Sequence, residues 1–388
     1  MKTIKKITTN DGTYYPLFNL KGLRSSMTPF FGGDLKLDHH HYALKPTTQV
    51  DLFNDLYARH VIIKCDDEIY FLNGQTEKQQ KDEITYETRL LSQRVLRKND
   101  LFDIETTSYI PLQENLELHL THITNRSSKS LTFDITTAIQ LYGRSADNLR
   151  DHRHVTSLLN QIQVVQNGIL LYPTLSFDER GHQANHTVYS AFAYSPQASV
   201  KNYIPVLDDF VQGGSMAFPK GLNHNETIGA IIKGYEALGG IGFEPIVLKP
   251  NESLQFIITI GIHESIEKAV SESHAYFDIE AFDEGLNATE RYFESYTSQL
   301  QFEFYDARTS NQLNFMTIQP MLRRYFGNSY LPHHDYGKGG RGWRDLWQDL
   351  LSLIMMNDQS GYELLFYNFQ GIRLDGSIAT FIGDQPGV

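Results

Sequence analysis

The most informative stretch of this 388-residue sequence is Leu331-Pro-His-His-Asp-Tyr-Gly-Lys-Gly-Gly-Arg-Gly-Trp-Arg-Asp-Leu-Trp-Gln-Asp349. It starts as a loop rich in His and Gly and runs into an amphipathic helix, which the apolar spacing predicts from about Trp343 to Met356. Asp345 stands in the first turn of this helix, where the helix dipole favours a carboxylate. The apolar face of the helix is expected to consist of Leu346, Leu350, Leu353 and Ile354.

Polar and aromatic groups crowd the start of this helix. Asp345 and Asp349 are one turn apart and can lie on one face, and they are accompanied by Arg341, Trp343, Arg344, Trp347 and Gln348. Carboxylates and guanidinium groups bind vicinal hydroxyls and an indole covers the C–H side of a sugar ring, so this set suits a pyranose site. The alternative is that Asp345 caps the helix, Arg344 pairs with a surface acid and both Trp are core residues. A phosphate-binding loop is disfavoured, because the order Gly-x-x-x-x-Gly-Lys-Ser/Thr is absent.

Residues 1 to about 262 are predicted to form strands. Residues 117–123 and 130–136 alternate apolar and polar side chains, and the turn-forming residues 125–128 between them predict a hairpin. Residues 254–260 form a β-branched run typical of a buried strand. Many short strands with Gly, Pro and Asn turns indicate a large antiparallel β-sandwich over residues 1–262.

The composition changes at His263 and becomes typical of helices. From Glu264 to about Leu300 the chain lacks Pro and is rich in Glu and Ala, which predicts a helical linker over 263–330. One side of an amphipathic helix can be lined by Ile279, Phe282, Leu286, Tyr292 and Phe293. Residues 362–369 are apolar and predict a further helix.

Charge and composition restrict the partners. The formal net charge is −12 and no basic stripe occurs, so a nucleic-acid partner is not expected. The N-terminus lacks the apolar segment of a signal peptide, no stretch is apolar enough to span a bilayer, and Cys65 is the only cysteine, so we expect a cytoplasmic protein without a membrane partner. We expect no metal at His39-His40-His41, because no further ligands cluster nearby. Residues 150–154 are expected to form a salt-bridge network.

The run from Gly339 to Asp349 resembles the Arg-Asp-x-x-Gln-Asp signature of glycoside hydrolase family 94, the inverting β-glucan phosphorylases. Residues 151–159 and 371–377 are also similar to that family. Within the family, the sequence of the signature run is most similar to the 1,2-β-oligoglucan phosphorylases and the phosphorylase-like part of cyclic β-1,2-glucan synthases. The resemblance implies a β-sandwich, a helical linker and the first helices of an (α/α)6 toroid beginning within residues 331–388.

The resemblance also implies a site and a reaction. Asp345 and Arg341 would bind the hydroxyls of the non-reducing glucose, with Trp343, Arg344, Gln348 and Asp349 as further substrate-binding residues. The reaction would be phosphorolysis of a β-linked gluco-oligosaccharide, with inorganic phosphate as co-substrate and no cofactor. No catalytic residue is assigned, because the general-acid Asp of the family stands in a Trp-Asn-Asp motif beyond residue 388.

On this reading the chain is a fragment that is inactive by itself and is completed by a C-terminal polypeptide or works as a homodimer. The alternative is a non-catalytic β-sandwich module that binds carbohydrate or contacts another subunit.

Overall fold

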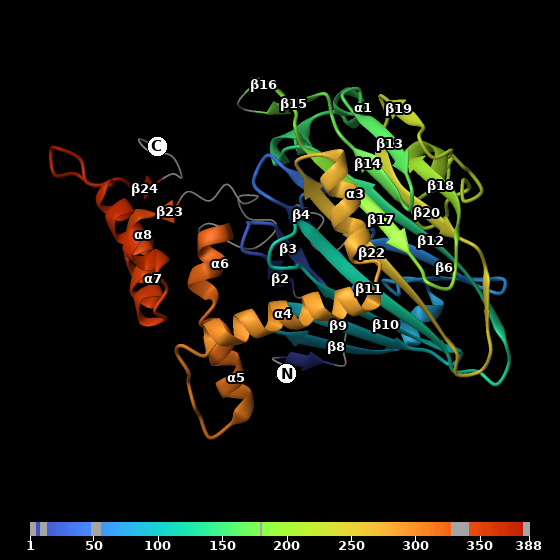
Figure 1. The fold of residues 1–388 in the computed structure, drawn as a ribbon, viewed down its shortest axis with the longest axis horizontal. Coiled ribbons are helices and arrows are strands. Elements are labelled where there is room, and N and C mark those ends of the chain that lie inside the picture. The colour runs from blue at the N-terminus through green and yellow to red at the C-terminus, as the bar shows by residue number, and fades with distance from the viewer. Residues whose placement is uncertain (1–4, 8–13, 48–55, 179–180, 327–340, 383–388) are drawn as a thin grey trace.

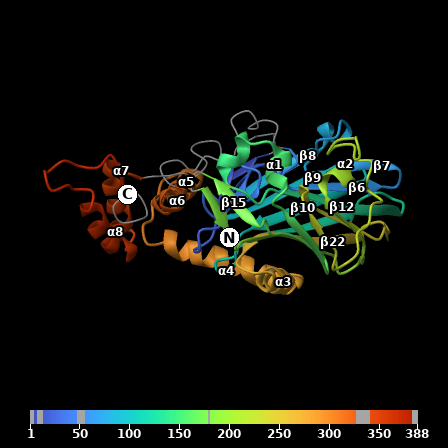
Figure 2. The ribbon, with the colours of Figure 1, turned by 90° about the horizontal axis from the view of Figure 1, so that it is seen from above.

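A computed structural model describes residues 5–7, 14–47, 56–178, 181–326 and 341–382 (Figure 1). Within these residues, antiparallel sheets form the N-terminal part and helices form the C-terminal part, as the sequence predicts. Figure 2 shows the sheets stacked at one end of the molecule and the last helices at the other.

The larger sheet has the strand order β1-β8-β9-β10-β11-β22-β17-β14-β13-β19 among the described residues, and neighbouring strands are antiparallel. Its strands are β1 (Lys5–Ile7), β8 (Glu83–Arg89), β9 (Ser92–Lys98), β10 (Phe102–Tyr109), β11 (Leu116–Asn125), β13 (Gln161–Val165), β14 (Gly168–Leu171), β17 (Val188–Tyr194), β19 (Ile231–Lys233) and β22 (Ser253–His263). The predicted buried strand over 254–260 is therefore confirmed as the middle of β22.

The second sheet has the order β18-β20-β12-β6-β7, and β21 also pairs with β12. Its strands are β6 (His60–Cys65), β7 (Glu68–Phe71), β12 (Leu131–Leu141), β18 (Val200–Val206), β20 (Ala237–Phe243) and β21 (Ile246–Leu248). Apolar side chains of both sheets meet in one core, which includes Ile63, Phe133, Ile135, Ile241, Ile258 and Ile260. The expected β-sandwich is thus present.

Smaller sheets and short helices complete the described N-terminal part. A four-stranded sheet consists of β2 (Tyr15–Phe18), β3 (Arg24–Met27), β4 (Leu35–Lys36) and β5 (Tyr42–Leu44), and β15 (Leu175–Asp178) pairs with β16 (Gly181–Ala184). The short helices are η2 (Lys78–Lys81), η3 (Ala146–Arg150), α1 (Arg153–Ser157) and α2 (Leu207–Val211).

The predicted hairpin between residues 117–123 and 130–136 is wrong. β11 pairs with β10 and β22 in the larger sheet, whereas β12 pairs with β6, β20 and β21 in the second sheet. The turn residues between them therefore carry the chain from one sheet to the other. Alternation and turn composition are local properties, and they do not determine which strand becomes the neighbour.

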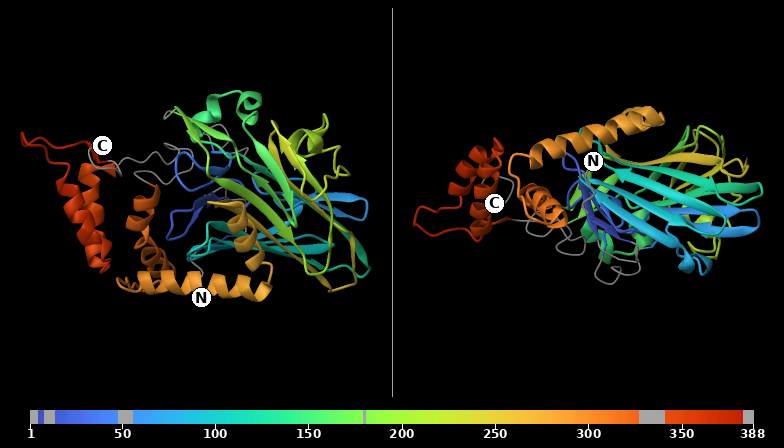
Figure 3. Two further views of the ribbon diagram at one scale, coloured as in Figure 1. Left: turned by 45° about the horizontal axis from the view of Figure 1, so that its top comes forward. Right: turned by 90° about the horizontal axis from the view of Figure 1, so that it is seen from below.

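Two helices cover the outer face of the larger sheet, α3 (Ile266–Ala275) and α4 (Ile279–Thr297) (Figure 3). On α4 the predicted apolar side is largely confirmed, since Phe282, Leu286 and Phe293 are buried, but Tyr292 is 38% exposed. The Phe282 ring packs edge-on against Tyr109 of β10 at 5.0 Å.

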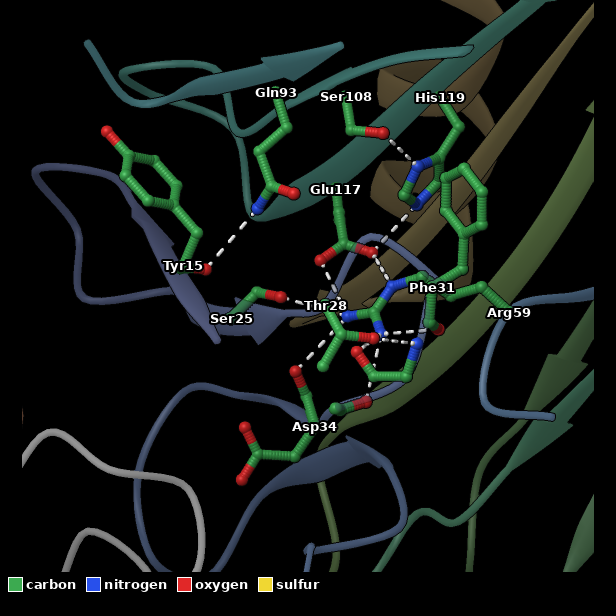
Figure 4. A network of polar contacts seen from close by, with 12 residues as sticks. Tyr15, Ser25, Thr28, Phe31, Asp34, Arg59, Gln93, Ser108, Glu117 and His119 are labelled. Atoms are coloured by element: carbon green, nitrogen blue, oxygen red, sulfur yellow. Dashed lines mark hydrogen bonds and ion pairs between the residues drawn. The ribbon is translucent and has the colours of Figure 1, made fainter. Parts of the chain in front are cut away.

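Strand β11 turns its apolar side chains toward α4 and its polar side chains into the sandwich. Leu116, Leu118 and Leu120 belong to the cluster that contains Phe282, whereas Glu117 and His119 point toward Arg59 (Figure 4). The Arg59 guanidinium donates to Glu117, to the carbonyl oxygens of Gly33 and Asp34 at 2.9 and 3.2 Å, and to Ser25 Oγ at 2.9 Å. This buried network fastens the four-stranded sheet to the larger one.

The remaining helices are α5 (Ala307–Met316), α6 (Gln319–Phe326), α7 (Trp343–Met355) and α8 (Ser360–Phe369), and the short strands β23 (Arg341–Gly342) and β24 (Phe381–Ile382) pair with each other. The helices predicted over 343–356 and 362–369 are confirmed as α7 and α8. Leu346, Leu350 and Leu353 are buried as expected, but Ile354 is 41% exposed. Among the described residues, no helix is both long enough and apolar enough to cross a bilayer.

Candidate functional site

The candidate site lies at the N-terminus of α7, which a short strand pair positions. Arg341 pairs with Ile382 and Gly342 with Phe381, and the Trp343 backbone N–H donates to the Thr380 carbonyl oxygen at 2.9 Å. The chain segment 371–382 therefore holds the first turn of α7. The Gly-rich loop 331–340, which the sequence also singled out, lies outside the described residues.

Both tryptophans pack between α7 and α8. The rings of Trp343 and Trp347 meet edge-on at 5.5 Å, and Trp347 meets Phe369 in the same way at 5.3 Å. The Trp343 indole N–H donates to the Asn368 carbonyl oxygen at 2.8 Å. These contacts correspond to the core role that the sequence left open as the alternative for the two indoles.

The polar candidates occupy two successive turns of α7. Arg344 is largely exposed, and its guanidinium lies 3.4 Å from a carboxylate oxygen of Asp345, which is itself partly exposed. Gln348 and Asp349 line a cavity of about 350 Å³ between α7 and the α5–α6 segment, together with Leu313, Met316 and Pro320. The first turn of α7 thus presents Asp345 and Arg344, and the second turn presents Gln348 and Asp349.

This arrangement can bind a polyhydroxylated ligand. Carboxylates accept hydrogen bonds from hydroxyl groups, and charge-assisted bonds of this kind are about twice as strong as neutral ones. Asp345 and Asp349 lie on the same side of α7 because they are four residues apart. Of the six residues named from the sequence, Trp343 packs against α8, and Arg341 is placed here only by its backbone.

A second cavity, of about 380 Å³, lies in the β-sandwich and was not predicted from the sequence. It is assembled from separate segments, and its lining includes His41, Arg144, Leu158, Asn160, Phe177 and His182. The sequence had marked parts of its surroundings, namely the histidines 39–41, residues 151–159 and the charged patch at 150–154, without indicating that they lie together. Within that patch Arg153 pairs with Glu236 at 3.0 Å and Asp208 at 3.4 Å, which confirms a salt-bridge network there.

Two other groupings of polar side chains are structural. Ser108, His119 and Glu117 form a hydrogen-bonded row that resembles a hydrolytic triad, with both contacts of the imidazole at 2.8 Å. Ser108 is only 1% exposed, so a substrate has no access to its hydroxyl. The three consecutive histidines pair with three different carboxylates, namely His39 with Asp147, His40 with Asp178 and His41 with Asp38. No group of His, Cys, Asp or Glu in the described part of the chain is arranged to hold a metal ion.

Comparison with known families decides the identity of the sandwich. Residues 47–278 match the model of the glycosyl hydrolase 94 supersandwich domain, which is more than half of the chain. The chain belongs to glycoside hydrolase family 94. This is a family of carbohydrate-active enzymes. The match of residues 47–278 agrees with the resemblance that residues 339–349 show to the same family. No match was found among curated proteins.

Solved structures show the same fold at low sequence identity. A bacterial glucoamylase complexed with acarbose aligns with 98% of this chain at a TM-score of 0.53 and 9% identity, and a putative kojibiose phosphorylase from the human microbiome aligns with 90% at a TM-score of 0.50 and 10% identity. The present chain covers only about half the length of these proteins, namely 51% of the glucoamylase and 46% of the kojibiose phosphorylase. The alignment with the glucoamylase includes the helices, so the fold class, a sandwich followed by helices of an (α/α)6 architecture, is confirmed.

Proposed function

We propose that this chain provides the sandwich, the linker and the first toroid helices of a phosphorylase that acts on β-linked glucosides. The expected reaction converts a β-1,2-linked oligoglucan and inorganic phosphate into α-glucose 1-phosphate and a shortened glucan. The observation that carries this proposal is the family 94 match over residues 47–278, followed by the Arg-Asp-x-x-Gln-Asp signature at residues 344–349.

Asp345 has the central role in the proposed sugar subsite. It stands at the N-terminus of α7 beside Arg344, and its carboxylate is partly exposed. Hydrogen bonds from sugar hydroxyls to this carboxylate can strengthen as the ring flattens toward an oxocarbenium-like transition state. Arg341, Gln348 and Asp349 are proposed to complete the contacts to the non-reducing glucose.

We expect the groups that break the glycosidic bond to lie outside these 388 residues. In an inverting displacement, phosphate attacks the anomeric carbon while a general acid protonates the departing oxygen on the opposite face. The family places that acid in a Trp-Asn-Asp motif, but Trp343 and Trp347 are followed by Arg and Gln. We therefore propose that a further C-terminal polypeptide carries the acid and the phosphate-binding residues.

Apolar side chains on α7 and α8 support docking of such a polypeptide. Leu351, Met355 and Phe366 are 61%, 57% and 77% exposed, which is unusual for large apolar residues gathered on two neighbouring helices. Helices that complete an (α/α)6 ring would cover these side chains.

The test is to fuse or co-express the 388 residues with the C-terminal part of a family 94 phosphorylase and to supply β-1,2-linked oligoglucans and phosphate. Release of α-glucose 1-phosphate by the combined protein is the expected result. A folded combination that releases no sugar phosphate from β-1,2-, β-1,3- or β-1,4-linked glucans would contradict the proposal.

A further inference from the structure

The cavity in the β-sandwich has the form of a ligand site. Its volume of about 380 Å³ falls in the range of about 300–1,000 Å³ that is typical of small-molecule sites. It lies beside α1 and the β15–β16 pair, at the top of the sandwich in Figure 1 and away from α7.

Large apolar side chains surround the opening of this sandwich cavity. Val155, Leu158 and Phe177 are 63%, 70% and 44% exposed, so their apolar surfaces are in water rather than in the core. The Phe177 ring lies beside the His182 ring, with the centroids 4.7 Å apart and the planes inclined by 34°. The two rings therefore form an adjacent, tilted pair at the opening.

The charged groups that line the cavity are already engaged by protein partners. The Arg144 guanidinium donates to the Tyr142 carbonyl oxygen at 3.1 Å, to Thr156 Oγ1, and to Glu236 at 3.3 Å. His41 Nδ1 lies 2.8 and 2.9 Å from the two carboxylate oxygens of Asp38. A guanidinium bound on three sides has little capacity left for a phosphate or a carboxylate. The electrostatics therefore favour an uncharged ligand.

Hydrogen-bonding capacity remains in the wall of the cavity. Asn160 is 1% exposed, and its amide N–H donates to the Tyr235 carbonyl oxygen at 2.8 Å. Its Oδ1 accepts no hydrogen bond from any described residue, although a buried amide oxygen without a donor is costly. The bond from His41 Nδ1 to Asp38 leaves Nε2 as the ring nitrogen that can meet a ligand hydroxyl.

We propose that this sandwich cavity binds a neutral saccharide of one or two hexose units. The C–H face of one ring would lie on Phe177 and His182, and hydroxyl groups would reach Asn160 Oδ1 and His41 Nε2. This site is separate from the candidate site on α7, and sugar binding there does not depend on the proposed phosphorolysis.

Isothermal titration calorimetry on the whole 388-residue chain tests the proposal, with glucose, sophorose (the β-1,2-linked glucose disaccharide) and α-glucose 1-phosphate as probes. We expect sophorose to bind, and the sugar phosphate to bind more weakly because the Arg144 guanidinium in the described lining is already held by Tyr142, Thr156 and Glu236. Phe177→Ala should weaken sophorose binding about tenfold, corresponding to about 1.4 kcal/mol, because it removes the ring on which the sugar would lie. Phe218→Ala is the matched control, since Phe218 is a 75% exposed phenylalanine elsewhere on the sandwich, and it should leave the affinity unchanged.

Asp345→Ala separates the two sites, and it should leave sophorose binding at the sandwich cavity unchanged. If Phe177→Ala lowers the melting temperature, Leu158→Ala replaces it, because Leu158 is 70% exposed at the same opening. The proposal is overturned if neither neutral sugar binds, or if binding survives Phe177→Ala and Leu158→Ala but is lost in Asp345→Ala. It is also overturned if these two sandwich variants change only the oligomeric state, because the cavity would then hold a second copy of the chain.

Discussion

Arg59 and Glu117 form a bidentate ion pair inside the sandwich, with Arg59 Nη2 2.8 Å from Glu117 Oε2 and both side chains at most 2% exposed. Glu117 also accepts from His119 at 2.8 Å. Burial alone would raise the pKa of Glu117, but the positive charge of Arg59 and the bonds from His119 and Arg59 outweigh it and hold the pKa well below its ordinary value.

The first prediction concerns the pH dependence of stability. A carboxyl group with a lowered pKa in the folded state stabilises that state above its unfolded-state pKa, and this contribution is lost as the pH falls. The free energy of unfolding should therefore decrease as the pH is lowered below the ordinary value of 4.5 for Glu117. Glu117→Gln should lower the free energy of unfolding at neutral pH by about 3–5 kcal/mol, because Arg59 then remains as an uncompensated buried charge.

Urea denaturation at several pH values measures this effect. Glu105→Gln is the control, since Glu105 also makes a two-pronged pair, with Arg94, but both side chains are about one third exposed. This change should cost less than about 1 kcal/mol. Equal losses in the two variants would show that the buried pair is not a special source of stability.

The second prediction concerns the cover that α4 provides for the larger sheet. Phe282→Ala should destabilise the chain by about 3–5 kcal/mol, because it empties a buried space against Tyr109. Tyr292→Ala on the same helix should cost less, since Tyr292 is 38% exposed. Thermal melts of both variants check the order, and a larger effect at Tyr292 would contradict the packing described for α4.

The third prediction concerns the stability of the β-sandwich segment, residues 1–262, when it is expressed without the helices that follow it. We expect this segment to melt cooperatively with a strand-dominated circular dichroism spectrum. Its melting temperature should be lower than that of residues 1–300, because removal of α3 and α4 uncovers Leu118, Leu170 and Phe192. A helical spectrum, or a melting temperature unaffected by the two helices, would refute this expectation.

Local sequence patterns predicted the type of element well. The apolar spacing predicted that α7 starts at Trp343 and ends within one residue of Met355. Such a prediction succeeds because the apolar face of a helix is formed by residues that are close together in the sequence. The pairing of strands could not be predicted from local patterns. β11 and β12 were expected to form a hairpin, but β11 lies between β10 and the distant strand β22, and β12 pairs with the distant strand β6.

The two candidate sites also differ in how far the sequence could predict them. The signature at 344–349 is contiguous, so it could be recognised before the fold was known. The sandwich cavity brings His41, Asn160 and Phe177 together from separate segments, and their local sequences do not indicate that they meet. Only the packing of the sheets and their loops creates that site.

The fourth prediction is that the 388 residues alone have no phosphorolytic activity. The family's Trp-Asn-Asp motif does not occur in them, so no general acid of that kind can protonate the leaving oxygen. The chain is incubated with β-1,2-linked oligoglucans and phosphate, and α-glucose 1-phosphate is assayed. Release above a control without protein would show that another residue of this chain acts as the acid.

The role of Asp345 is the central claim, and Asp345→Asn in the combined protein tests it most directly. Asp345 stands in the first turn of α7, three residues after the N-cap Gly342, so a purely structural carboxylate there would act only through the helix dipole, and its loss would cost at most about 1 kcal/mol of stability without changing kcat. Asp278→Asn is the matched control, since the Asp278 carboxylate accepts from the Glu280 N–H at the start of α4. We predict that Asp345→Asn lowers kcat at least about tenfold, corresponding to about 1.4 kcal/mol, while the melting temperature stays that of the control variant. An active combined protein in which Asp345→Asn leaves kcat unchanged would remove Asp345 from the substrate site.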